Sequence, residues 1–268
     1  MIYINENIQS KIDSITYDNL YIVTDFDSTI TAGNSESSWG ILSKSDLVPK
    51  QYVKERQELY NYYRPFEFDS SLDFETRSNL MYEWWNKHIS LFLKYQLSEE
   101  VINKAASDLR VMEFRDGAKE FLDKMSENNI PIIIISAGIG NFVEQFLVKN
   151  NCNYDNIYIV ANFIRFKDGT AIGMSNNVIH SLNKNEVSLP KEIKEKVANR
   201  KNILLLGDLV ADIKMVSEEK RDHTLRIGFL EADVEEYMEQ YKESFDIVCT
   251  NNTSYKELLK ILKIPNFS

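Results

Sequence analysis

The chain is poor in cysteine, glycine, proline and long apolar runs, and each shortage excludes a class of protein. Its two cysteines, Cys152 and Cys249, lack the spacing of a metal-binding pair, and so few thiols are typical of a reducing compartment. With nine glycines and five prolines, no segment is a flexible linker that would divide the chain. No apolar run approaches the about 18 residues of a membrane-spanning helix, so we expect a soluble protein without a membrane partner.

Basic residues are also scarce. The 31 lysines and arginines are outnumbered by 41 aspartates and glutamates, which gives a formal net charge of −10. A polymeric nucleic acid needs a concentrated basic face, so this balance argues against such a partner. A small anionic substrate remains compatible with it if a metal ion and local cations offset the repulsion. Residues 1–14 have neither a basic start nor an apolar run, which predicts no signal peptide and a cytoplasmic location.

Short apolar runs rich in β-branched residues recur along the chain. Continuous runs of this kind are typical of strands buried on both faces of a parallel sheet. Helical patterns lie between the later runs, and this alternation predicts an α/β fold. The expected strands are 20–24, 131–135, 156–160, 203–206, 224–227 and 245–248. The expected helices are 116–127, 140–149, 191–197 and 234–241, and a β-hairpin is expected within 161–180.

A long interruption follows the first expected strand. The apolar spacing there predicts three helices, at 46–63, 74–95 and 98–110. A helical block inserted at this point would lie over the carboxyl edge of the sheet, where open α/β sheets bind ligands. We therefore expect a Rossmann-like core of residues 1–32 and 110–268 that carries a helical cap of residues 33–109.

Four motifs with polar side chains follow the apolar runs. In chain order they are Asp25 and Asp27; Ser136, Ala137 and Gly138; Lys184; and Asp208 and Asp212. Taken singly, each has an ordinary interpretation as solvated aspartates in a loop, a tight turn, a surface lysine or acids at a helix N-terminus. Their common position after expected strands is what suggests a shared site.

Parallel strands would bring these motifs to one edge of the sheet. Neighbouring carboxylates such as Asp25 and Asp27 repel each other unless a divalent cation such as Mg²⁺ relieves the repulsion. A hydroxyl followed by glycine, as at Ser136, can offer hydrogen-bond donors to a phosphate. The set therefore contains a nucleophile, a proton donor, metal ligands and a fixed cation, which together are what phosphoryl transfer requires.

The motifs also resemble those of a known superfamily. The segments DFDST (25–29), ISAGIG (135–140), Lys184 and GDLVAD (207–212) resemble the four signatures of the haloacid-dehalogenase-like phosphatases. Within that superfamily, the stretches ANFIRF, VIHSLNK and RIGFLEADVEEYMEQY are similar to the cytosolic 5'-nucleotidase III, or pyrimidine 5'-nucleotidase, family. In the expected cap, YYRPFEFD and MYEWW are similar too. The resemblance covers about residues 21–262 and implies a haloacid-dehalogenase-like fold.

The resemblance implies a mechanism that uses Mg²⁺. Asp25 would attack phosphorus and carry an aspartyl-phosphate. Asp27 would protonate the leaving group and then activate water. The metal ion would be held by the Asp25 carboxylate, the Asp27 backbone carbonyl and Asp208, with Asp212 supporting it.

The resemblance also implies how a phosphate monoester, most readily a nucleoside 5'-monophosphate, would bind. Ser136, with Ala137 and Gly138 beside it, and Lys184 would hold the phosphoryl oxygens. In the cap, Glu67 would contact the base and Trp85 would stack on it. The neighbouring cap aromatics have a simpler interpretation as the core of a helical bundle.

Some residues depart from the family pattern and leave the substrate open. Ala211 stands where glycine is common, Asn141 replaces an acid, and residues 32–39 replace a cysteine-containing entry to the cap. The alternatives are a phosphatase for phosphoserine or a sugar phosphate, transfer of phosphate to a nucleoside acceptor, and a phosphate-binding module without catalysis. A stacking aromatic and a carboxylate in the cap would favour a nucleotide, whereas arginine there would favour phosphoserine. The sequence does not indicate the oligomeric state.

Overall fold

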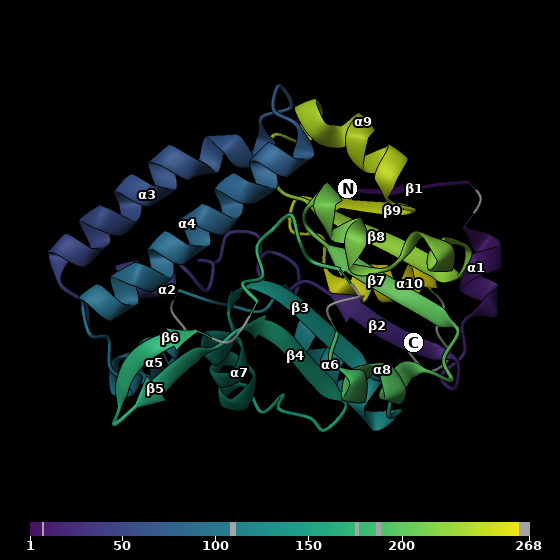
Figure 1. Ribbon diagram of the computed structural model, residues 1–268. Coiled ribbons are helices and arrows are strands. Elements are labelled where there is room, and N and C mark those ends of the chain that lie inside the picture. The colour runs from purple at the N-terminus through teal and green to yellow at the C-terminus, as the bar shows by residue number, and fades with distance from the viewer. Residues whose placement is uncertain (7, 108–110, 175–176, 186–188, 263–268) are drawn as a thin grey trace.

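The centre of the fold is a mainly parallel sheet. The computed structural model describes residues 1–262 except 7, 108–110, 175–176 and 186–188. Its sheet strands are β1 (Ile2–Ile4), β2 (Leu20–Thr24), β3 (Ile132–Ile139), β4 (Ile157–Asn162), β7 (Asn202–Gly207), β8 (Thr224–Leu230) and β9 (Ile247–Thr250). They are ordered β1-β9-β8-β7-β2-β3-β4, and all pairs are parallel except β1 with β9. The predicted α/β fold is confirmed (Figure 1).

Both faces of the sheet are buried by helices, as the continuous apolar strands predicted. The helices of the core are α1 (Gln9–Ser14), α6 (Ala118–Glu127), α7 (Gly140–Lys149), α8 (Lys191–Val197), α9 (Val234–Ser244) and α10 (Tyr255–Leu262). Because successive strand residues point to opposite faces, Ile22 and Ile134 join the apolar cluster formed with α6, α7 and α10. Val23 and Ile133 join a second cluster that includes Val197 of α8.

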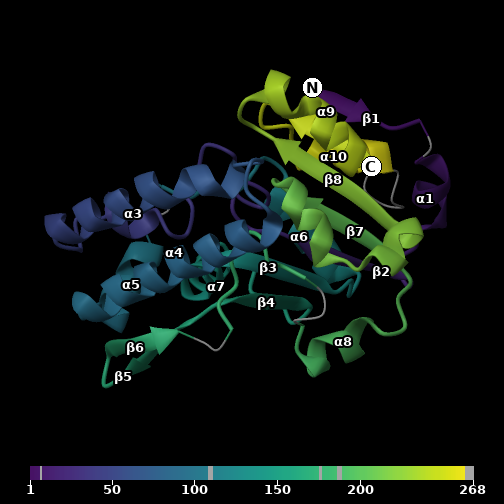
Figure 2. The same cartoon turned by 45° about the horizontal axis from the view of Figure 1, so that its top comes forward.

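A block of helices is inserted between β2 and α6. It consists of α2 (Ile41–Lys44), α3 (Lys50–Phe68), α4 (Phe74–Lys94) and α5 (Glu99–Ala106). The long helices α3 and α4 lie side by side and extend beyond the sheet (Figures 1 and 2). Asp73 caps α4 by accepting from Thr76 N at 2.7 Å, and Ser98 caps α5 by accepting from Val101 N at 3.2 Å. All four helices lie within residues 33–109, the range for which a helical block was expected.

The predicted hairpin is present and is bonded to the helical insertion. Its strands are β5 (Ile164–Lys167) and β6 (Thr170–Met174). The turn residues Asp168 and Gly169 have φ angles of 50° and 74°, as a two-residue type I′ turn requires. Glu99 N donates to Gly169 O and Ala171 N donates to Leu97 O, both at 2.9 Å. Backbone hydrogen bonds thus join the hairpin to the connection between α4 and α5.

Several predicted boundaries are wrong. The strand predicted to end at 135 continues to Ile139, so the residues expected in a turn belong to β3. The helix predicted to stop at Tyr63, before Pro65, runs on to Phe68. Tyr63 and Glu67 are both buried on this helix, and packing here outweighs the helix-breaking tendency of proline. The helix predicted over 98–110 ends at Ala106, and residues 108–110 lie outside the described part of the chain.

The chain ends differ most from prediction. The short elements β1, α1 and α10, of three, six and eight residues, were not predicted. The last strand begins at Ile247 rather than 245, because Phe245 closes α9 by donating its N–H to Tyr241 O.

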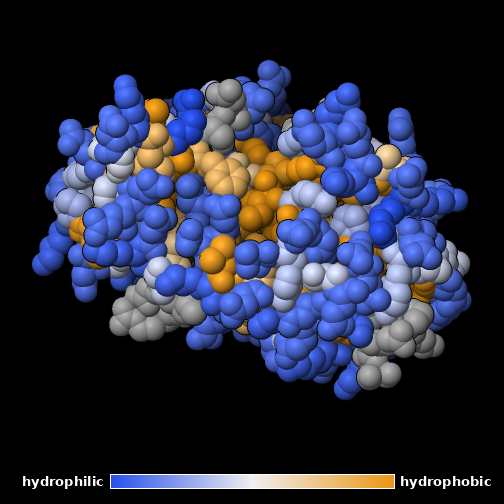
Figure 3. Space-filling view, turned by 90° about the horizontal axis from the view of Figure 1, so that it is seen from below, coloured by the Kyte–Doolittle hydropathy of each residue, from blue (hydrophilic) through white to orange (hydrophobic). Residues whose placement is uncertain are grey.

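The face of the molecule drawn in Figure 3 is mostly hydrophilic. No helix among the described residues is both long and apolar enough to cross a membrane. Figure 3 views the molecule from below Figure 1 and shows an apolar area in the middle of that face, surrounded by hydrophilic residues. Strands β1 and β4 form the two edges of the sheet. At the β4 edge, residues Ile157 to Val160 are only partly buried.

Candidate active site

The centre of the sheet carries the candidate site. Strand β2 pairs in parallel with both β3 and β7, so the strand order reverses at β2, and such switch points form crevices at the carboxyl ends of strands. Asp25 directly follows β2, where its N–H donates to Leu206 O at 2.9 Å. Ser136 comes from β3 and Asp208 follows β7. Three distant parts of the sequence therefore meet at one place.

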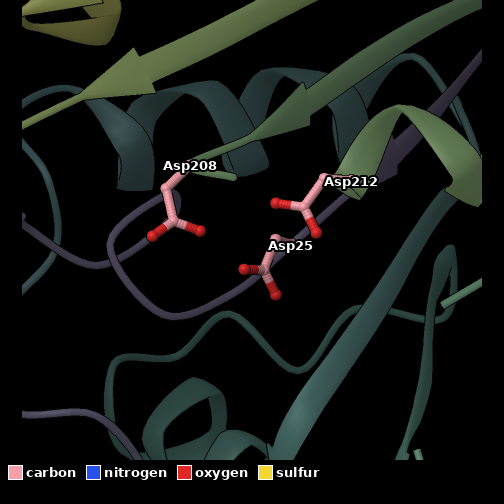
Figure 4. Close-up of side chains that lie close together, drawn as sticks. All are labelled: Asp25, Asp208 and Asp212. Atoms are coloured by element: carbon pink, nitrogen blue, oxygen red, sulfur yellow. The ribbon is translucent and has the colours of Figure 1, made fainter. Parts of the chain in front are cut away.

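Three carboxylates gather at this point. Asp25, Asp208 and Asp212 each offer an oxygen within 4.8 Å of the other two, and Figure 4 shows the carboxylates facing one another. Asp212 belongs to a 3₁₀ segment (Val210–Met215) rather than to an α-helical turn, and its Oδ2 accepts from Leu209 N at 3.0 Å. Gly207 permits this approach, because a Cβ there would lie 2.5 Å from the Cβ of Asp212.

Lys184 bridges two of these carboxylates. Its Nζ lies 2.7 Å from Asp25 Oδ1 and 3.0 Å from Asp212 Oδ1, and the lysine side chain is only 3% exposed. Burial alone would lower the pKa of Lys184, but the negative charges of Asp212 and Asp25 outweigh burial and raise this pKa. Lys184 therefore stays positively charged at neutral pH.

The remaining acid charge fits a metal ion. Burial, followed by the charges of Asp25 and Asp212, raises the pKa of Asp208 well above its usual range. One lysine cannot offset three clustered carboxylates. Hard divalent cations such as Mg²⁺ prefer carboxylate oxygens, so the chemistry and spacing of these donors fit such an ion.

Asp27 has surroundings unlike those of the other three acids. Its carboxylate accepts from Ser38 N at 3.1 Å and from Ser38 Oγ at 3.0 Å. Burial and the charge of Asp25 raise the pKa of Asp27 to about 7, although the Ser38 hydrogen bonds oppose this increase. Asp27 can therefore gain and lose a proton near neutral pH. Its carboxylate faces Ser38, which leaves its backbone carbonyl as the group for the predicted metal contact.

The end of β3 is hydrogen-bonded to the helical insertion. Ala137 O accepts from Trp39 Nε1 at 3.0 Å, from Trp85 Nε1 at 2.7 Å and from Asn162 Nδ2 at 2.9 Å. Ser136 Oγ is buried beside it and accepts from Gly138 N at 3.0 Å. The bonds from Trp39 and Trp85 fix the strand end against the inserted segment, and the bond from Asn162 fixes it against β4.

A cavity of about 240 Å³ joins the acids to the inserted helices. This is far more than the about 10–15 Å³ that one water needs. The lining includes most of the predicted site residues, namely Asp25, Asp27, Glu67, Trp85, Ser136, Ala137, Gly138, Lys184 and Asp208. Asp212 is fully buried and reaches this group through Lys184. The sequence prediction thus identified residues that share one cavity.

Other residues of the cavity were missed. They are Ser28, Ser37, Trp39, Arg56, Tyr60, Arg64, Trp84, His88, Ser181 and Leu209. Trp39 lies in the segment 32–39, which departs from the family pattern. That departure was the feature of the sequence that could have drawn attention to Trp39. Arg56 lies in the charged run KERQE, which is typical of a solvated helix face, so the sequence offered no signal for it.

Two departures from the family pattern have local explanations. Asn141 Oδ1 accepts from Ile164 N at 2.7 Å and so joins α7 to the hairpin. Ala211 packs in an apolar cluster with Leu182 and Trp85. Neither residue replaces a group that the acid cluster needs.

His88 should make stability depend on pH. It is 4% exposed and packs against the rings of Trp39 and Trp84. Burial, helped by the charge of Arg56, lowers its pKa from 6.5 to about 3. Below about pH 6.5 the unfolded chain binds a proton that folded His88 does not, so the free energy of unfolding should fall by about 2 kcal/mol by about pH 5.

Urea unfolding of the wild type and of His88→Gln at about pH 7.5 and pH 5 would measure this effect. His180, whose pKa burial lowers to about 4, contributes in both proteins and cancels. We expect the loss of stability between the two pH values to be smaller in the variant by about 2 kcal/mol. An equal loss in both proteins would contradict the assignment.

Comparison with known proteins agrees with this geometry. The family model described as pyrimidine 5'-nucleotidase (UMPH-1) matches residues 23–264. The chain belongs to this family. The match covers most of the chain, so the predicted resemblance to the pyrimidine 5'-nucleotidase family is confirmed.

Two of the relatives are 7-methylguanosine phosphate-specific 5'-nucleotidases. The Drosophila melanogaster protein is 34% identical over 242 residues, which cover 87% of this chain and 76% of the relative. The Mus musculus protein is 35% identical over 239 residues, which cover 86% of this chain and 79% of the relative. These family members carry enzyme names, and the chain is an enzyme of the same phosphoric monoester hydrolase class.

Solved structures share the fold. Cytosolic 5'-nucleotidase IIIB bound to cytidine matches with a TM-score of 0.88 and 30% identity, covering 97% of this chain and 92% of that one. A substrate-bound phosphoserine phosphatase matches with a TM-score of 0.61 and 21% identity, covering 92% and 99%. The second likeness concerns the haloacid-dehalogenase-like fold alone.

Proposed function

We propose that the chain hydrolyses nucleoside 5'-monophosphates in a Mg²⁺-dependent reaction, with Asp25 as the nucleophile. The observation that carries this proposal is that one cavity is lined both by Asp25 and Lys184, which would hold the phosphate, and by Glu67 and Trp85 of the inserted helices, which would face the base. The names of the 5'-nucleotidase relatives support the nucleotide substrate. Residues 33–109 would then act as the cap that selects the leaving group.

The first step would transfer the phosphoryl group to the enzyme. A carboxylate oxygen of Asp25 attacks phosphorus, and the bond from phosphorus to the 5' oxygen breaks. Asp27 gives its proton to the departing oxygen, and a pKa of about 7 suits this role. Lys184, which stays charged, offsets the negative charge of the phosphoryl oxygens and Ser136 can donate to them.

The second step would return the enzyme to its starting state. Asp27, now a carboxylate, takes a proton from water, and the water oxygen attacks the phosphorus of the aspartyl-phosphate. Phosphate leaves and Asp25 is free again. Mg²⁺, held by Asp25, Asp208 and the Asp27 carbonyl with Asp212 behind them, would supply further stabilisation of negative charge.

A phosphorylated amino acid is the second candidate substrate. Arg56 and Arg64 line the same cavity, and arginine in the cap was the feature expected for phosphoserine. Arg64 forms an ion pair with Glu67, so of these two arginines Arg56 is the one left to pair with a substrate carboxylate. The aromatic lining by Trp84, Trp85 and Trp39 favours a flat base over serine.

The proposed location is the cytoplasm. The Caenorhabditis elegans relative, 30% identical over 261 residues, is named a putative cytosolic 5'-nucleotidase 3. The structural relative is also named as cytosolic. Both names support the proposal, as does the low cysteine content.

A phosphate-release panel would test the proposed function. With Mg²⁺, we expect kcat/KM for uridine and cytidine monophosphates to exceed that for phosphoserine and ribose 5-phosphate by about 10-fold or more, because the base adds contacts in the cavity. Removal of the metal ion with EDTA should abolish turnover, and added Mg²⁺ should restore it. Turnover of phosphoserine equal to or better than that of uridine and cytidine monophosphates would contradict the nucleotidase proposal. Absence of turnover with every monoester would favour a binding module instead.

A further inference from the structure

Unpartnered polar atoms gather in the candidate cavity. Among the described residues, the buried side-chain atoms without a hydrogen-bond partner include Arg56 Nε, Trp84 Nε1, His88 Nδ1 and Ser181 Oγ. All four residues line the cavity. A buried donor without a partner is destabilising, because it has lost its hydrogen bonds to water and gained none in the protein. A cavity that concentrates such donors is suited to a ligand that supplies hydrogen-bond acceptors.

Arg56 differs from the other arginine of the cavity in its partners. Arg64 donates to the buried carboxylate of Glu67. Arg56 has no such partner at its Nε. The ionisable groups that interact electrostatically with its guanidinium are Tyr52, Glu36 and Tyr60. Glu36 also forms an ion pair with Lys44, with 3.3 Å between Glu36 Oε1 and Lys44 Nζ.

The end of the cavity between α3 and α4 is therefore positive. Arg56 and Arg64 contribute two positive charges and Glu67 contributes one negative charge, which leaves a net charge of +1. His88 adds none at neutral pH, because burial lowers its pKa to about 3. A positively charged group bound here would be repelled at short range in a partly desolvated site.

The leaving groups of candidate nucleotides respond differently to this charge. Methylation of guanine at N7 gives the base a positive charge, which Arg56 would repel. Uracil and cytosine are neutral and carry carbonyl oxygens, which accept from a guanidinium and from an indole N–H. Glu67 can accept from the ring N–H of uracil or from the amino group of cytosine. The chain thus carries a charge pattern suited to a neutral, carbonyl-bearing base.

We propose that Arg56 is a specificity-determining residue that selects leaving groups whose base is neutral or anionic and disfavours the cationic base of 7-methylguanosine monophosphate. This inference rests on the proposed function and narrows its substrate. It separates the chain from its relatives named as 7-methylguanosine phosphate-specific.

Substrate ratios in Arg56→Met would test the inference. Methionine keeps an unbranched apolar stem but removes the charge and the donors. In the wild type we expect kcat/KM for uridine and cytidine monophosphates to exceed that for 7-methylguanosine monophosphate by about 10-fold or more. In the variant this ratio should fall by about 10- to 100-fold, because a hydrogen bond to a charged group is lost for one substrate and a repulsion is lost for the other.

Three controls make the result specific. Arg56→Lys keeps the charge without the planar donor fork and should retain discrimination against 7-methylguanosine monophosphate. Arg165→Met changes an exposed arginine of β5, outside the cavity, and should leave the ratio unchanged. Ribose 5-phosphate lacks a base, so a damaged fold would lower its turnover together with that of every nucleotide.

The possible outcomes separate the two proposals. A wild type that prefers 7-methylguanosine monophosphate would overturn the inference, and so would an Arg56→Met variant that slows all substrates alike. In either case turnover of nucleotides would leave the proposed function standing. If no nucleoside monophosphate is hydrolysed, the proposed function fails and the inference fails with it.

Discussion

Asp25→Asn should lower phosphate release by at least about 10⁴-fold, the scale on which loss of a nucleophile acts in covalent catalysis. The amide is nearly isosteric but cannot form the acyl phosphate. Asp25 also contacts Lys184 at 2.7 Å, so the variant should bind substrate differently as well. Single-turnover measurements of phosphate release with Mg²⁺ would give the size of the loss.

Two further measurements distinguish lost chemistry from lost folding. Thermal unfolding of Asp25→Asn should remain cooperative. Beryllium fluoride mimics a phosphoryl group on a carboxylate, so it should protect the wild type against heat but not the variant. Variant activity above about a tenth of the wild-type value would remove Asp25 from the role of nucleophile, provided that freshly prepared protein is used to limit deamidation.

Arg115→Met should be strongly destabilising, with a loss of about 3–5 kcal/mol in the free energy of unfolding. The Arg115 side chain is fully buried and forms an ion pair with Glu231 at 2.5 Å. It also donates to Thr29 O at 3.1 Å and to Ser28 O, in the loop that follows Asp27. Its removal leaves Glu231 without its ion-pair partner, although Asn252 N still donates to that carboxylate. It also takes one donor away from each of the two loop carbonyls. For a chain of this size we expect the melting temperature to fall by about 6–20 °C.

Guanidinium unfolding of Arg115→Met beside Arg221→Met would check this prediction. Arg221 also pairs with a glutamate, at 2.8 Å, but both side chains are largely exposed. Exposed pairs contribute about 0–1 kcal/mol, so the control should remain close to wild type. A similar loss of stability in both variants would show that burial of the Arg115 pair has no special effect.

The core of the fold could be predicted because its strands are apolar on both faces. Runs such as Leu20 to Thr24 leave no polar face for solvent and therefore require cover on both sides. The three-residue strand β1 could not be predicted in this way. It is formed only by pairing with β9, from the other end of the chain, and local patterning contains no information about such a partner.

The residues of the candidate site likewise fall into two groups, those that could be predicted from the sequence and those that could not. Asp25 and Asp208 directly follow apolar strands and Ser136 lies near the carboxyl end of one, so their convergence could be predicted from the topology alone. Arg56 and Trp39 reach the cavity from inserted segments whose packing angle is set by tertiary contacts. Their side chains are not placed by any strand end, and helix periodicity alone does not show which face of α3 meets the sheet.

The attachment between the hairpin and the helical insertion includes two main-chain hydrogen bonds, from Glu99 N to Gly169 O and from Ala171 N to Leu97 O. Exchange of one side chain for another leaves these amide and carbonyl groups in place. The side chains at this junction can therefore change while the two hydrogen bonds that join the hairpin to the insertion persist. Only the introduction of proline, which has no amide hydrogen, would delete a donor from it.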